Sequence, residues 1–263
     1  TFIKELTLRL QFKGLVPAEY AELAPELAAV KGIKMPLDGM IDLEAKLPRT
    51  LKKLSVQLTG GKGSLQFAPF LPEETSLRHV ELEAEADYAT GQIEMRKLAV
   101  KLKHGEVTAS GLLQRDAEGK YAVKGNAEAK NITKKTIMRF WPEMLAPMTR
   151  EWVDTSIVSA TVPQASFTVD APPGGLEAEV LADEILKTVI QVKDAKVDYV
   201  PGFPRAEDAA GTVTITGNAL KADIQAARML GQTLLTAPGE VSIPELAADK
   251  MEIYVKLPVS SEA

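Results

Sequence analysis

Apolar and polar residues alternate with a period of two over much of the chain. The first run sets Leu6, Leu8, Leu10 and Phe12 against polar neighbours, and the same alternation returns at 41–47, 54–58, 65–67 and 80–88. Successive side chains of a β-strand point to opposite faces of its sheet. Each run therefore predicts a strand with one apolar face and one face in water.

The run at 80–88 is the clearest case, because Val80, Leu82, Ala84, Ala86 and Tyr88 are interleaved with four acids, Glu81, Glu83, Glu85 and Asp87. Carboxylates at alternate strand positions lie about 7 Å apart in a row, and they do not converge as calcium ligands do. We interpret this row as a solvated face.

Short turn sequences separate the strands, at 60–63, 89–91, 104–106 and 116–119. Such spacing predicts hairpins in an antiparallel meander, with consecutive strands paired. Two regions have a helical pattern, at about 17–30 and 134–157, and proline interrupts both. The sequence thus predicts strands with two short helical interruptions.

Similar segments recur in the two halves of the chain. Leu23-Ala24-Pro25 matches Leu145-Ala146-Pro147, and further matches follow in the same order at an offset that grows from about 122 to about 134 residues. This predicts a duplicated helix-plus-meander unit, with copies at 1–134 and 135–263 that continue into each other as one groove.

Composition narrows the function classes. The net charge of -5 comes without a basic stripe, so we expect no nucleic-acid partner. Only 5% of the residues are aromatic, so the apolar surface is aliphatic and suits acyl chains better than sugars or bases. The chain has no cysteine, no run of about 18 apolar residues and no leader-like start, so we expect a segment whose membrane anchor lies outside it.

Catalytic motifs are absent from the sequence. It has two histidines, His79 and His104, without HExxH or GxSxG, and the glycine-rich stretch at 60–64 lacks the P-loop spacing. We expect no enzyme activity, no cofactor and no metal. A glycan-acting enzyme with converging carboxylates is the distant alternative.

The apolar strand faces pose the functional question, since they form either the core of a closed sandwich or an open trough. Small residues such as Ala109, Gly111 and Gly125 favour curvature, and the chain offers little sequence to cover so many one-sided strands. We predict a mainly β fold of repeated antiparallel meanders curled into an open groove. The candidate groove-lining residues are Leu6, Leu8, Leu10, Ile41, Leu43, Leu54, Val56, Leu58, Val80, Leu82, Val107, Val123, Ile190, Val192, Val213, Ile215, Ile224, Ile253 and Val255.

The second helical region is rich in large apolar side chains and is expected to lie over the groove. The candidate residues of this helix are Phe140, Trp141, Met144 and Trp152.

The stretch Phe-Trp-Pro-Glu-Met-Leu-Ala-Pro at 140–147, continued by Arg-Glu-Trp-Val at 150–153, resembles the tryptophan-containing segment of the AsmA-like superfamily, specifically its YhdP-type central domain. The segments at 23–27, 36–39 and 197–204 look like recurring segments of the same family. The resemblance implies an envelope protein anchored in the inner membrane, whose stacked β-meanders form a long groove that carries phospholipid between membranes. It carries over no catalytic residue.

Two functions follow as hypotheses. The first is a periplasmic segment of a lipid conduit, with phospholipid or another acyl-chain lipid, neighbouring repeats of the full-length chain and the external inner-membrane anchor as partners. The second is a non-transporting assembly scaffold of the envelope that binds proteins through strand edges and polar faces.

Overall fold

The computed structural model describes residues 5–46, 50–67, 71–141, 147–178, 180–199, 202–233, 238–246, 252–256 and 258. The chain divides into two compact units. The first unit comprises Thr1–Ala127 with Asp170–Gly175, and the second comprises Glu128–Val169 with Leu176–Ala263. The predicted duplication at 1–134 and 135–263 stays a prediction.

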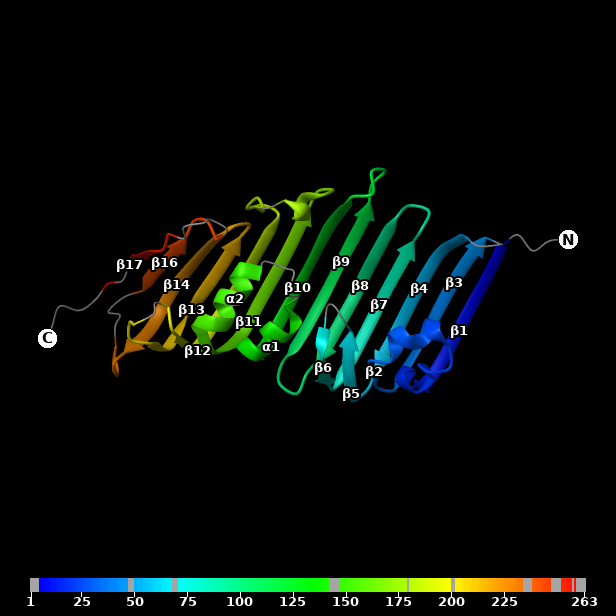
Figure 1. The fold of residues 1–263 in the computed structure, drawn as a ribbon, viewed down its shortest axis with the longest axis horizontal. Coiled ribbons are helices and arrows are strands. Elements are labelled where there is room, and N and C mark those ends of the chain that lie inside the picture. Colours follow the sequence, from blue (N-terminus) through cyan, green and yellow to red (C-terminus); the bar gives the residue numbers. More distant parts are fainter. Residues whose placement is uncertain are drawn as a thin grey trace. The chain divides into compact units, whose positions relative to one another are not determined.

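The first unit is built on an antiparallel meander (Figure 1). Its main strands, in hydrogen-bonded order, are β1 (Glu5–Leu15), β3 (Leu37–Lys46), β4 (Thr50–Gly60), β7 (His79–Asp87), β8 (Gln92–Lys101) and β9 (Glu106–Arg115). A separate small sheet contains β2 (Ile33–Lys34), β5 (Gly63–Phe67) and β6 (Leu71–Leu77). We refer to these three strands as the cap.

The expectation that all consecutive strands pair is wrong at the cap. β4 pairs with β7, because the chain leaves the main sheet after Gly60 and forms β5 and β6 before it returns. The glycine-rich turn at 60–63 was expected to make a hairpin within the meander, and instead it connects the two sheets.

The second unit continues the antiparallel pattern. Its strands include β11 (Ile157–Ala171), β12 (Leu186–Val197), β13 (Ala206–Thr216), β14 (Ala219–Met229), β16 (Gly239–Ile243) and β17 (Tyr254–Lys256), with β15 (Gln232–Thr233) paired to β14. β10 (Tyr121–Thr133) and β11 both cross the division between the units. In each unit the main strands follow one another in hydrogen-bonded order, and no described residues pair the first strand of a unit with its last, so the sheet of each unit is open.

Both predicted helical regions are present. The first consists of two 3₁₀ turns, η1 (Pro17–Tyr20) and η2 (Pro25–Val30), each with a proline in its first turn. The second consists of α1 (Lys134–Phe140) and α2 (Pro147–Ser156). A further 3₁₀ turn, η3, spans Gly175–Glu177. Helices therefore account for a small part of the described chain, as expected for a mainly β protein.

The buried core of the first unit lies at one end of its sheet. A Cβ on Gly60 would lie 2.5 Å from Val80 Cγ1, 2.9 Å from Leu37 Cδ2 and 2.9 Å from Met35 Sδ. Met35 directly follows β2, so the cap packs on the face that carries Leu37 and Val80 (Figure 1). The buried residues of this region are Met35, Leu37, Leu71, Thr75, Leu77, Val100 and Leu102.

Gly60 tests this packing. Gly60→Val places two branches where Met35, Leu37 and Val80 already lie, so it should lower the free energy of unfolding by about 1–3 kcal/mol. Urea denaturation followed by circular dichroism measures the change. Gly61→Ala is the matched control, because a Cβ there meets only Pro36 Cγ, at 3.5 Å, and should have little effect. Equal stability of the two variants would refute the proposed packing at Gly60.

Candidate functional site

One face of the first unit's main sheet is apolar from strand to strand. The strand registers align its residues in rows that cross the sheet, and the row nearest the cap passes through Leu37, Gly60, Val80, Val100 and Val107. The row farther from the cap passes through Leu8, Leu43, Leu54, Ala86, Ile93 and Leu113. We call this surface the apolar face of the first unit.

The structure places the candidates of this unit on that one face. They are Leu6, Leu8, Leu10, Ile41, Leu43, Leu54, Val56, Leu58, Val80, Leu82 and Val107. Val123 in β10 joins them. On the polar side, Ser110 Oγ donates a hydrogen bond to Asn126 Oδ1 at 2.9 Å, so Asn126 lies on the polar face, and Val123 has the opposite parity along β10. That they line a lipid groove stays a prediction.

Among the described residues, no second layer covers most of this face. Leu8 is 45% exposed, Leu10 51% and Ile93 47%, while Leu43 and Leu54 are half-buried. A core of a closed sandwich would bury such side chains completely. Away from the cap, the aliphatic surface is therefore open to a ligand.

Sequence reasoning missed the contribution of β8, because a bulge interrupts its alternation. Ile93 and Met95 share the apolar face with Leu98, where the register shifts by one residue. The extra residue lies at the polar pair Arg96-Lys97. Two adjacent charged residues inside an alternating run were the signal that could have located this bulge.

The second unit carries an apolar face of the same kind. A row passes through Ala165, Ile190, Val213, Ala222, Val241 and Val255. The candidates Val192, Ile215 and Ile224 lie on the same face by register. Ile253 precedes β17 and is 45% exposed, and Val255 within β17 is 58% exposed. All candidates of this unit thus lie on its apolar rows or next to them.

The tryptophan-containing helices pack against each other. Arg150 donates from Nε to the Trp141 carbonyl at 3.2 Å and from Nη2 to the Met138 carbonyl at 3.4 Å. The candidates Phe140, Trp141 and Trp152 are half-buried, and Met144 lies outside the described residues. In Figure 1, α2 lies in front of the sheet at β11 and β12, within the second unit.

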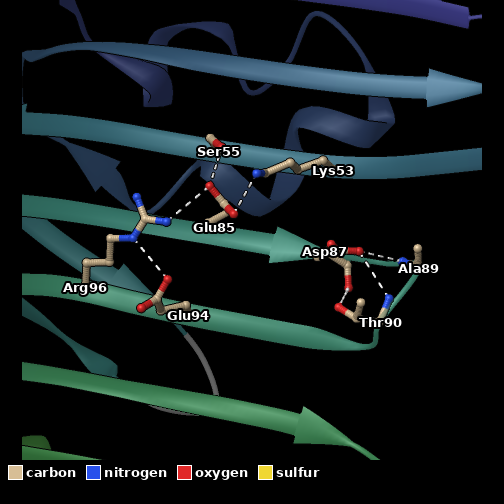
Figure 2. A network of polar contacts seen from close by, with 8 residues as sticks. All are labelled: Lys53, Ser55, Glu85, Asp87, Ala89, Thr90, Glu94 and Arg96. Atoms are coloured by element: carbon tan, nitrogen blue, oxygen red, sulfur yellow. Dashed lines mark hydrogen bonds and ion pairs between the residues drawn. The ribbon is translucent and has the colours of Figure 1, made fainter.

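The opposite face of the first unit is a network of ion pairs (Figure 2). Glu85 Oε1 pairs with Lys53 Nζ at 2.8 Å, and Glu85 Oε2 accepts from Ser55 Oγ at 3.2 Å and pairs with Arg96 Nη2 at 3.4 Å. Arg96 also pairs with Glu94 at 3.0 Å. The hydrogen bond from Lys53 is the main cause that lowers the pKa of Glu85. The extra residue of the β8 bulge thus links acids on two strands.

The acidic row of β7 is on this polar face, as predicted. Glu81 pairs with Lys97 and, at 2.9 Å, with His79 Nε2, and these contacts lower the pKa of Glu81 to about 2. Asp87 closes the following turn by accepting from the amides of Ala89 and Thr90. No group of three potential metal ligands occurs within the described ranges. Glu81 and Glu85 are matched by cations and Asp87 by turn amides, so their arrangement serves the sheet and the turn.

The pairing of Glu81 with Lys97 gives a pH prediction. Because the pKa of Glu81 is lowered in the folded state to about 2, the pair contributes stability above pH 4.5 and loses it as the pH falls toward 2. Lys97→Met should raise the pKa of Glu81 toward its ordinary value, measured by NMR titration of the side-chain carboxyl. Lys103→Met removes the same charge from an exposed turn and should leave Glu81 unchanged. A Glu81 titration unaffected by Lys97→Met would contradict the pairing.

Comparison with known proteins shows which family the sequence matches. Within the described part of the chain, no helix is both long enough and apolar enough to cross a membrane. None of the curated proteins matches the sequence, and none of the solved structures does. The family model described as YhdP protein matches residues 6–263. This match covers the strands of both units and the tryptophan-containing helices, so the chain belongs to the YhdP family.

Proposed function

We propose that this chain is a non-catalytic segment of a lipid conduit, which binds acyl chains on the apolar faces of its sheets and passes phospholipid between the inner and outer membranes. The observation that carries the proposal is a row of apolar residues that crosses six paired strands and that no described residues cover with a second layer. The row is Leu8, Leu43, Leu54, Ala86, Ile93 and Leu113. A contiguous apolar surface of this kind on a folded protein marks a site of interaction.

Family membership also supports a function in lipid transport. Members of the YhdP family are envelope proteins with a role in lipid transport, and the family model matches nearly the whole chain. A periplasmic location, an inner-membrane anchor outside this segment and neighbouring repeats of the full-length chain are parts of the proposal.

The chemistry of the face suits transfer better than storage. Burial of aliphatic surface contributes about 0.8 kcal/mol per CH₂ group, so an acyl chain can be held without a specific polar contact. Residues of the central rows are nearly all aliphatic, as Ile41, Val56 and Leu82 illustrate. Successive positions along such a surface bind with similar strength, so a lipid can move from one to the next.

Charged substitutions on the apolar face test the proposal. Leu43→Asp and Leu10→Asp should each reduce retained phospholipid at least about tenfold, because a carboxylate on this surface must be desolvated beside an acyl chain. Native mass spectrometry of protein purified under mild conditions measures the lipid. Leu10 is 51% exposed, so its substitution should leave the fold intact.

Gln11→Asp is the matched control, because Gln11 is the next residue of β1, is exposed and lies on the polar face. It should retain lipid like the unchanged protein. Lipid retention that is equal in Leu43→Asp, Leu10→Asp and Gln11→Asp would rule out the conduit. The scaffold function would then account for the apolar face as a protein-binding surface.

A further inference from the structure

The apolar face of the first unit ends differently at its two ends. At one end the cap covers it, and at the other end the strands finish in residues with polar tips. Tyr88 directly follows β7 and has the parity of Ala86, and Arg115, the last residue of β9, has the parity of Leu113, so both continue the apolar side. Tyr121, at the start of β10, has the same parity as Val123. We call Tyr88, Arg115 and Tyr121 the polar rim.

The Arg115 guanidinium is held in place without a carboxylate. Its Cζ lies 5.9 Å from the centroid of the Tyr121 ring, and its Nε donates to the Gly119 carbonyl at 3.5 Å. A Cβ on Gly119 would lie 3.2 Å from Arg115 Nη2, so the guanidinium also packs against that turn. Among the described residues, no acid forms an ion pair with Arg115.

Other arginines of this unit's main sheet are neutralised. Arg9 pairs with Asp42 at 2.6 Å, and Arg96 pairs with Glu94 at 3.0 Å and Glu85 at 3.4 Å, all on the polar face. Arg115 therefore combines two features. It lies on the apolar side of the sheet, and most of its five N–H donors have no acceptor among the described residues.

We propose that Arg115 binds the phosphate of a phospholipid at the polar rim, with the acyl chains lying along the strands toward the cap. This inference rests on the proposed function and adds an orientation and a head-group site to it. A guanidinium matches a phosphate with two parallel hydrogen bonds. Tyr88 and Tyr121 fit the same boundary, since tyrosine places its ring against apolar groups and its hydroxyl in water.

The dimensions of the face agree with this orientation. From Leu113 to Val107 in β9 is six residues, or about 20 Å at a strand rise of about 3.3 Å per residue. The hydrocarbon core of a bilayer is about 30 Å thick, so the acyl chains of one leaflet extend about 15 Å. One acyl chain therefore fits between the polar rim and the cap.

The experiment compares two lipids that differ only in the phosphate-containing head group. The 263-residue chain is loaded with phosphatidylglycerol or with diacylglycerol of the same acyl chains, and retained lipid is measured by native mass spectrometry. Arg115→Gln should lower phosphatidylglycerol retention by about three- to tenfold, since it removes a charge-assisted hydrogen bond at an exposed site. Diacylglycerol retention should not change, and Arg115→Lys should recover part of the loss.

Arg96→Gln is the matched control, because it removes the same charge from the polar face and should leave both lipids bound. Retention of phosphatidylglycerol by Arg115→Gln, with loss of both lipids in Leu43→Asp, would overturn the head-group site and leave the proposed function standing. Unchanged binding of both lipids in Leu43→Asp would instead overturn the proposed function. Displacement of phosphatidylglycerol by millimolar inorganic phosphate would identify a free-anion site and also overturn the inference.

The orientation of the bound lipid can be measured separately, by NMR with spin-labelled lipids. Phosphatidylglycerol with a nitroxide near the end of an acyl chain should broaden the NMR signals of Leu82 and Leu98 near the cap more than those of Tyr88. A nitroxide on the head group should do the reverse. The opposite pattern, or equal broadening, would overturn the proposed direction of the lipid.

Discussion

The fold depends on backbone hydrogen bonding between strands that have one apolar face and little to cover it. In a two-layer protein, the burial of that face would supply most of the stability. In the first unit, complete burial is concentrated at the cap, around Met35, Leu77 and Val100. The remaining strands are held by their pairing and by cross-strand contacts between half-buried side chains such as Ile41 and Val56.

The polar face contributes to this arrangement through charge matching. Like charges directly opposite each other on neighbouring strands are destabilising, and Glu85 does lie opposite Glu94. Arg96 contacts both carboxylates, because the bulge in β8 places its side chain between them. Exposed ion pairs of this kind contribute little individually. Their main effect is to keep one face of the sheet in water and to fix which face remains for an apolar ligand.

Much of the fold could be read from the sequence, because alternation of period two is a direct consequence of strand geometry. The strands at 41–47, 54–58 and 80–88, their shared apolar face and the acidic row of β7 all followed from it. The cap did not follow, since the pairing of β4 with β7 is a long-range choice that no local pattern encodes. The bulge at Arg96 was missed because a single inserted residue reverses the parity of everything after it.

The polar rim could be predicted only in part from the alternation of residues along the sequence. Arg115 is the last residue of β9, and only the registers place it beside the same surface as Leu113 and Ile93. Two facts make it available to a ligand. No described carboxylate pairs with its guanidinium, and the guanidinium is held against the ring of Tyr121. A uniform aliphatic face can hold acyl chains in either direction. An asymmetric pair of ends, one capped and one polar, gives the bound lipid a direction.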